Sequence, residues 1–163
     1  MKYKKFLFVL SVLFTLAAIL VVVEAQNKSG SGANALLGTW KVRLTPVVPP
    51  QPQFDELMTF SPGGGIVESN NYPFFQTQLA AGPGQGTWSY DGEQTFSFTF
   101  YKFLYAPGGQ AAGTLKASGT INYSGADDTW SGPAEVSICD NQGNNCNPIG
   151  TTEGQATRLA AGS

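Results

Sequence analysis

The chain contains no histidine, and this absence narrows the chemistry that its 163 residues can carry. Histidine is the usual general base for serine and cysteine nucleophiles and the commonest protein ligand of zinc, copper and iron. We therefore expect neither a histidine-dependent hydrolase nor a transition-metal centre. No cofactor and no metal is predicted, and the interpretation leans away from an enzyme.

Charged residues are also scarce, at 12% of the chain. After residue 25 there are six Lys and Arg residues against ten Asp and Glu residues. Phosphate binding requires clustered Lys and Arg, so nucleic acid is not an expected partner. The composition predicts no particular oligomeric state.

The N-terminus has the pattern of a secretory signal peptide over residues 1–25. Three of its first five residues are lysines, residues 6–23 are almost wholly apolar, and small residues precede Gln26. We predict cleavage before Gln26. Because the apolar run is nearly long enough to cross a bilayer, an uncleaved anchor is the alternative, and it would be the only membrane contact. Either way the protein is expected outside the cytoplasm, in the periplasm, at the cell surface or secreted.

The chain has only two cysteines, Cys139 and Cys146, within one Asn- and Gly-rich segment. In an exported protein this spacing predicts a disulfide. Residues 26–35 have the Gly, Ser and Asn composition of a flexible linker. The remaining residues, 36–160, are predicted to form one domain.

That domain shows alternation of period two, broken by Gly, Pro, Asn and Asp clusters, and no sustained helical period. Eight strands are predicted, at residues 37–45, 54–60, 65–70, 86–90, 95–105, 113–123, 129–139 and 150–159. Mostly short connections favour antiparallel neighbours. An all-β, eight-stranded antiparallel up-and-down β-barrel is preferred over a sandwich because closure removes the exposed sheet edges.

The alternation directs most of the large aromatic side chains inward. Those expected to face the interior are Trp88, Tyr90, Phe96, Phe98, Phe100 and Trp130. They either form the wall of an apolar ligand pocket or fill the core, and an eight-stranded barrel has room for either arrangement.

Three charged residues are also candidates for the interior. Glu56 shares the face of Met58 in its strand, and Lys102 shares the face of the inward phenylalanines. Glu68 joins them if Ile66 rather than Val67 faces the core. A buried charge must be paired or hydrated, so these side chains would bond one another or line a watered cavity. A β-bulge near Tyr101 is the alternative, since it would turn Lys102 to solvent.

Two short motifs resemble those of the lipocalin-like, or calycin, barrels. Gly38-Thr39-Trp40 resembles their Gly-x-Trp in the first strand, and Thr157-Arg158 resembles the terminal-strand arginine that packs across the indole. The resemblance implies that Trp40 and Arg158 close one end of the barrel, with a structural role. More loosely, Leu57-x-Thr59-Phe60 before a Gly-rich turn is similar to uncharacterised bacterial secreted barrels.

The leading functional hypothesis is a secreted or surface-tethered barrel that binds a small, mostly apolar molecule in its interior. The predicted ligand contacts are the six inward aromatic residues together with Glu56 and Lys102. An enzyme of the barrel cyclase or isomerase kind is the alternative, with Glu56, Glu68 or Lys102 as acid or base. A filled barrel acting as a structural or surface module is the third.

Overall fold

The computed structural model describes residues 32–72 and 79–160. Within them lie one short 3₁₀ helix, η1 (Asn34–Leu36), and nine strands. The strands are β1 (Gly38–Val48), β2 (Phe54–Phe60), β3 (Gly65–Asn70), β4 (Ala80–Ala81), β5 (Gly84–Gly92), β6 (Thr95–Tyr105), β7 (Ala111–Ser124), β8 (Thr129–Cys139) and β9 (Asn147–Arg158). The predicted signal peptide and most of the predicted linker lie outside the described residues. Over the described part of the chain, no helix has the length and apolar character needed to cross a membrane.

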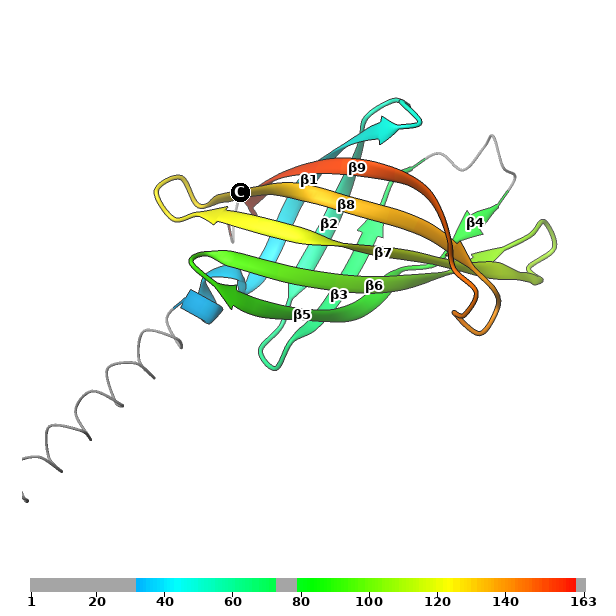
Figure 1. The fold of residues 1–163 in the computed structure, drawn as a ribbon, viewed down its shortest axis with the longest axis horizontal. Coiled ribbons are helices and arrows are strands. Elements are labelled where there is room, and N and C mark those ends of the chain that lie inside the picture. The colour runs from blue at the N-terminus through cyan, green and yellow to red at the C-terminus, as the bar shows by residue number, and fades with distance from the viewer. Residues whose placement is uncertain (1–31, 73–78, 161–163) are drawn as a thin grey trace, which may run out of the picture.

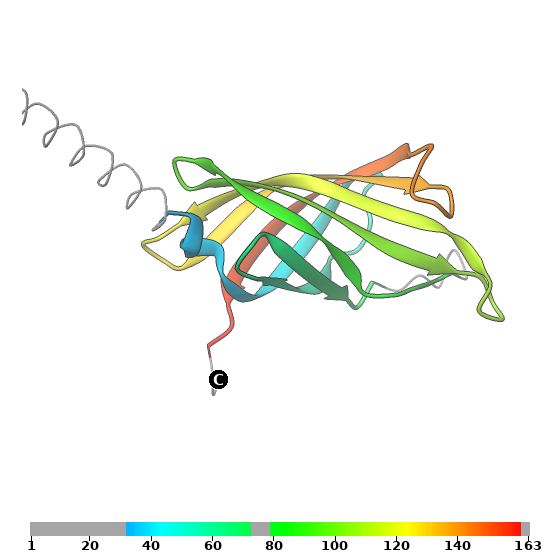
Figure 2. The same cartoon turned by 90° about the horizontal axis from the view of Figure 1, so that it is seen from below.

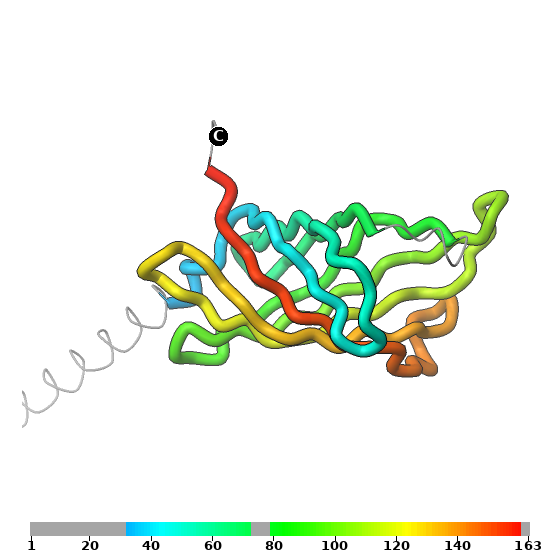
Figure 3. Tube along the Cα trace, turned by 90° about the horizontal axis from the view of Figure 1, so that it is seen from above, coloured from blue at the N-terminus to red at the C-terminus, as the bar shows by residue number. Residues whose placement is uncertain are grey.

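Eight of the strands form a closed antiparallel barrel (Figure 1), which confirms the predicted fold class. β1 pairs with β2, β2 with β3, and β3 with β5. From β5 to β9, each strand pairs with the next along the chain. The last strand, β9, returns to pair with β1, and the two lie side by side in Figure 3. The short β4 pairs with β6 and is not part of the ring. The barrel therefore has an interior bounded on all sides by hydrogen-bonded strands.

The sequence alternation becomes an inner and an outer face. In β6, Phe96, Phe98 and Phe100 are buried, whereas Ser97 and Tyr101 on the opposite face are exposed. Glycine permits close approach where β5 meets β6, because a Cβ on Gly86 would lie 1.9 Å from the carbonyl oxygen of Thr99. The inward rings and the close strand contacts together form the core.

The structure decides both alternatives that concerned the direction of interior charges. In β3, Ile66 is buried and Val67 is 50% exposed, so Glu68 points inward with Ile66. The β6–β7 register runs unbroken from Thr95 to Leu104, and the first shift comes after Leu104. The alternative of a bulge near Tyr101 is therefore wrong, and Lys102 points inward with 3% exposure.

One end of the barrel is covered by η1, which lies beside the end of β9 (Figure 2). Leu36 is fully buried, and its carbonyl accepts a 2.8 Å hydrogen bond from Trp40 Nε1. Asn34 and Ala35, which the sequence placed in the linker, lie in this helix, and Ala35 packs against the core. At the opposite end, Cys139 and Cys146 form the predicted disulfide between β8 and β9.

Candidate functional site

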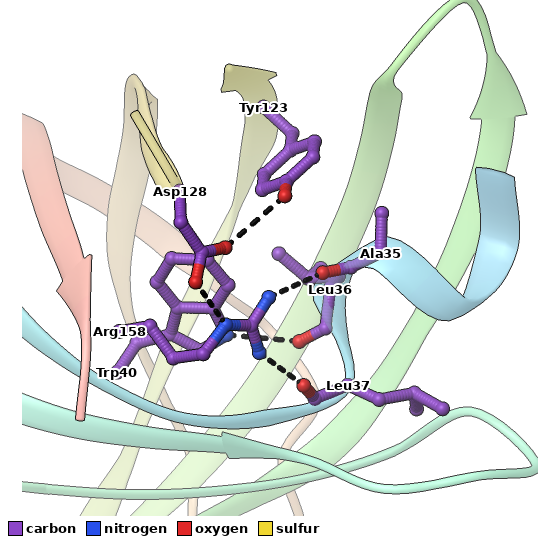
Figure 4. Close-up of polar contacts among 7 residues, drawn as sticks. All are labelled: Ala35, Leu36, Leu37, Trp40, Tyr123, Asp128 and Arg158. Carbon is purple, nitrogen blue, oxygen red and sulfur yellow. Dashed lines mark hydrogen bonds and ion pairs between the residues drawn. The ribbon is translucent and has the colours of Figure 1, made fainter. Parts of the chain in front are cut away.

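The covered end of the barrel is fastened by Arg158, the last residue of β9. Its guanidinium lies over the Trp40 ring, 4.1 Å from the centroid, as the strand register that pairs these two residues requires. Nη2 donates a 2.6 Å hydrogen bond to the carbonyl of Ala35, and Nη1 donates to the carbonyl of Leu37. The guanidinium thus joins the first strand, the last strand and η1 (Figure 4).

Asp128, in the turn before β8, supplies the counter-charge for this arginine. Its Oδ2 accepts a 2.6 Å hydrogen bond from Arg158 Nε, and its Oδ1 accepts one from the Tyr123 hydroxyl at 3.1 Å. The hydrogen bond from Arg158 lowers the pKa of Asp128, while burial followed by the bond to Asp128 raises the pKa of Tyr123. The guanidinium has a partner at each of its three nitrogens, so its role here is to hold the closed end together.

Beyond this end, the barrel contains a cavity of about 350 Å³. Its inner end includes Trp130, which also contacts Trp40 edge to face at 6.4 Å between ring centroids. Its outer end is formed by the far ends of β1 and β9 and the connection after β1, including Val48, Pro49 and Ile149. The cavity therefore runs along the interior from the closed end toward the opposite mouth.

Most of the side chains around the cavity are apolar. They include Leu44, Phe54, Met58, Phe98, Phe100, Leu104, Leu115, Ala117, Ala134, Val136 and Ile138. Small residues on β8 and β9 leave the space open, notably Gly132, Ala134 and Gly154. Among the described lining residues, Glu56 and Lys102 are the two that can carry a charge at neutral pH.

The structure divides the predicted ligand contacts into two groups. Phe98, Phe100, Trp130, Glu56 and Lys102 line the cavity. The other three do not.

Trp88, Tyr90 and Phe96 instead pack on one another in the core. Phe96 lies 5.8 Å from Trp88 and 5.1 Å from Tyr90 between ring centroids, and Trp88 also meets Phe60 edge to face. The Trp88 indole N–H donates to the carbonyl of Ser61 in the β2–β3 turn and to that of Gly65, the first residue of β3. These rings fill the barrel because they lie on the halves of β5 and β6 nearest the covered end.

Lys102 and Glu68 form a buried ion pair beside the cavity. Lys102 Nζ lies 2.9 Å from Glu68 Oε1 and 2.8 Å from Oε2, and the two side chains are 3% and 0% exposed. Gly84 on the neighbouring β5 makes room for them, because a Cβ there would lie 2.6 Å from Glu68 Oε2. A buried pair of this kind contributes little net stability, but removal of one partner leaves the other charge uncompensated.

Glu56 is the third ionisable group of this cluster and the carboxyl that lines the cavity directly. Its pKa is raised well above the ordinary value, first by burial and then by the negative charge of Glu68 and a hydrogen bond to that carboxylate. Lys102 and the Asn70 amide act in the opposite direction but do not cancel these effects. Burial beside Glu68 therefore favours the protonated form of Glu56, while Lys102 and Glu68 balance each other's charge.

Sequence reasoning missed two residues of this site, Asn70 and Thr152. Asn70 lies on the same face of β3 as Ile66 and Glu68, so its position follows once that face is known. Thr152 lines the cavity from β9, and both its hydroxyl and the Trp130 indole N–H are buried without a hydrogen-bond partner among the described residues. We refer to Glu56, Asn70 and Lys102 as the polar spot of the cavity.

Over residues 32–72 and 79–160, no group of three or more Cys, Asp or Glu side chains is arranged to hold a metal ion.

Comparison with known proteins assigns no family to this chain. No family model matches the chain, and no curated protein matches it. A solved redesigned β-barrel is similar to it over 79% of this chain and 96% of the barrel's own chain, with 16% sequence identity and a TM-score of 0.46. At this level of similarity the match carries no argument about function. The lipocalin-like resemblance stays a prediction.

Proposed function

We propose that this protein is an exported barrel that binds a small, mostly apolar molecule in its interior. The observation that carries the proposal is the cavity of about 350 Å³, lined mainly by Leu, Met, Phe and Val side chains. Ligand pockets in proteins are typically about 300–1,000 Å³, so this cavity is at the small end of that range.

The shape of the interior supports binding at this place. Arg158, its partner Asp128 and the Trp40 ring close the covered end. A ligand would therefore enter at the opposite mouth, beside Val48 and Ile149. Transfer of an apolar ligand from water into such a cavity releases roughly 25 cal/mol for each Å² of apolar surface removed from water. The small residues of β8 and β9 provide the space that the opposing phenylalanines would otherwise fill.

Two features support export. The signal-like pattern of residues 1–25 predicts entry into a secretory pathway, and the Cys139–Cys146 disulfide is typical of proteins in an oxidising compartment. A barrel that carries a scarce apolar molecule outside the cytoplasm agrees with both features.

Binding of Nile red, an uncharged dye that fluoresces in apolar surroundings, tests the proposal. We expect saturable binding to the purified protein and loss of at least about tenfold in affinity in Ala134→Phe, whose ring would occupy the cavity. Ala126→Phe, the same change in an exposed turn, is the matched control. Absence of saturable binding, or equal binding by both variants, would refute the proposal and favour a structural module. Native mass spectrometry would identify a ligand retained during purification.

A second candidate function, acid catalysis on the bound molecule, is favoured by one observation. Glu56 lies on the wall of an apolar cavity, and burial and the Glu68 carboxylate raise its pKa, which favours the protonated form that a general acid requires. If the protein is a cyclase or isomerase of this kind, Glu56→Gln should abolish conversion of the retained molecule even when the variant is saturated with it. Conversion by Glu56→Gln at the rate of the unmodified protein would exclude Glu56 as the acid.

A further inference from the structure

The charges around the cavity restrict what kind of molecule it can accept. Lys102 is the one cation among its described lining residues, and both oxygens of Glu68 already lie within 2.9 Å of its ammonium. Glu56 lies against the same pair. Lys102 and Glu68 are therefore balanced in charge before any ligand enters.

We propose that the cavity selects an uncharged molecule with an apolar body and a single hydroxyl or carbonyl group, and discriminates against carboxylates and amines of the same shape. This inference rests on the function proposed above and names the chemical class of its ligand. It follows from the geometry of Lys102, Glu68 and Glu56 and from the apolar character of the remaining wall.

A carboxylate ligand finds no available counter-charge in this interior. Its nearest cation would be Lys102, which is engaged by Glu68, and its nearest acidic groups would be Glu56 and Glu68. Transfer of an ionised carboxylate from water to such a place costs several kcal/mol unless it is paired and hydrogen-bonded. The anion would thus lose hydration and meet like charge.

An ammonium ligand is disfavoured for the complementary reason. It would have to ionise Glu56 in a buried position beside Glu68, and its own charge would lie close to Lys102. Both ions would lose their hydration, and a buried ion pair rarely recovers that loss.

An uncharged hydroxyl or carbonyl group avoids both penalties and still finds partners. The Thr152 hydroxyl and the Trp130 indole N–H lie in the cavity wall without a partner among the described residues. Glu56 and Asn70 also line the cavity, and the Asn70 side-chain carbonyl accepts a hydrogen bond from the Tyr72 backbone N–H. A buried polar group that gains a hydrogen bond is stabilised by about 1–3 kcal/mol relative to one left unpaired. The cavity wall is therefore mostly apolar, with a few polar groups that can form a hydrogen bond with one oxygen atom of a ligand.

Displacement of Nile red by decanol, decanoate and decylamine at neutral pH tests the inference, because the three share one apolar chain. We expect decanol to bind at least about tenfold more tightly than either ion. Equal or tighter binding of decanoate or decylamine would overturn the inference, although the proposed function would stand. If Nile red itself shows no saturable binding, the proposed function fails instead, so the two failures are distinguishable.

A pair of substitutions tests whether charge balance is the cause. The double variant Glu56→Gln/Glu68→Gln leaves Lys102 without a carboxylate, so decanoate should gain at least about tenfold relative to decanol. The matched control is Glu135→Gln/Glu153→Gln, which makes the same two substitutions at exposed positions and should keep the original ranking. An unchanged ranking in a folded double variant would also overturn the inference. The ranking in the unmodified protein decides the question if that variant does not fold.

Discussion

Substitution of Glu56 by glutamine should remove most of the pH dependence of stability near neutrality. Burial, the Glu68 charge and the hydrogen bond to Glu68 raise the pKa of Glu56 in the folded protein above its ordinary value of 4.5. Between pH 4.5 and the pKa of Glu56 in the folded state, this carboxyl therefore keeps its proton in the folded protein and loses it in the unfolded chain. This contribution to stability is complete below pH 4.5 and is lost as the pH rises through the folded pKa.

The magnitude follows from a single proton. Where the folded protein holds it and the unfolded chain does not, the free energy of unfolding falls by about 1.4 kcal/mol per pH unit. For a domain of this size, each pH unit between 4.5 and the folded pKa of Glu56 therefore lowers the melting temperature by roughly 5 °C. The chain contains no histidine, so no imidazole titrates in the same interval to obscure the effect.

Urea unfolding at pH 5, 6 and 7, followed by tryptophan fluorescence, measures this dependence. The unmodified protein should lose stability with rising pH, while Glu56→Gln should be nearly flat and more stable than the unmodified protein at pH 7. Glu135→Gln, an exposed carboxyl on β8, is the control and should keep the slope. A flat profile in the unmodified protein, or the same slope in Glu56→Gln, would refute the reasoning about the buried acid.

Three further substitutions test other parts of the structure. Arg158→Lys should lower the free energy of unfolding in urea by about 2–3 kcal/mol, because a lysine cannot reach three partners and also cover the indole. Arg43→Lys, at a half-exposed ion pair, is the control and should lower it by less than about 1 kcal/mol. Similar losses in the two variants would contradict the role of Arg158 in closing the barrel. Lys102→Met should lower the free energy of unfolding by about 3–5 kcal/mol, because it leaves Glu68 buried and unpaired. The double variant Lys102→Met/Glu68→Met should regain much of that stability. If it does not, the pairing of the two residues is contradicted. Gly86→Ala should lower the melting temperature sharply in circular dichroism, since its Cβ would meet the β6 backbone, and an unchanged melt would show that the strands can separate there.

The barrel itself could be predicted because alternation decides most of its strands. In β6 the three inward phenylalanines alternate with polar residues, so the face was clear from the sequence. In β3 the adjacent Ile66 and Val67 are both apolar over only six residues, and alternation could not decide between them. The direction of Glu68 therefore required the three-dimensional register with β2 and β5.

The extent of the cavity could not be predicted from the faces alone. Trp88 and Trp130 both belong to inward-facing positions and both pack in the core, yet Trp130 lines the cavity and Trp88 does not. The height of a residue in a barrel depends on strand stagger, which alternation does not encode. The pairing of Asp128 with Arg158 could not be predicted for a similar reason. An aspartate in a turn is expected to be solvated, and only the position of the last strand places Arg158 beside it.

The arrangement of the chain ends has a practical consequence. Asn34 to Leu36 and Arg158 lie together at one pole of the barrel, while the entrance beside Val48 and Ile149 lies at the other. An affinity tag or a solid support joined to the domain beside Asn34 or Arg158 would thus be attached at the pole opposite the cavity mouth. The domain could be mounted on a sensor surface with every copy presenting its opening to the sample.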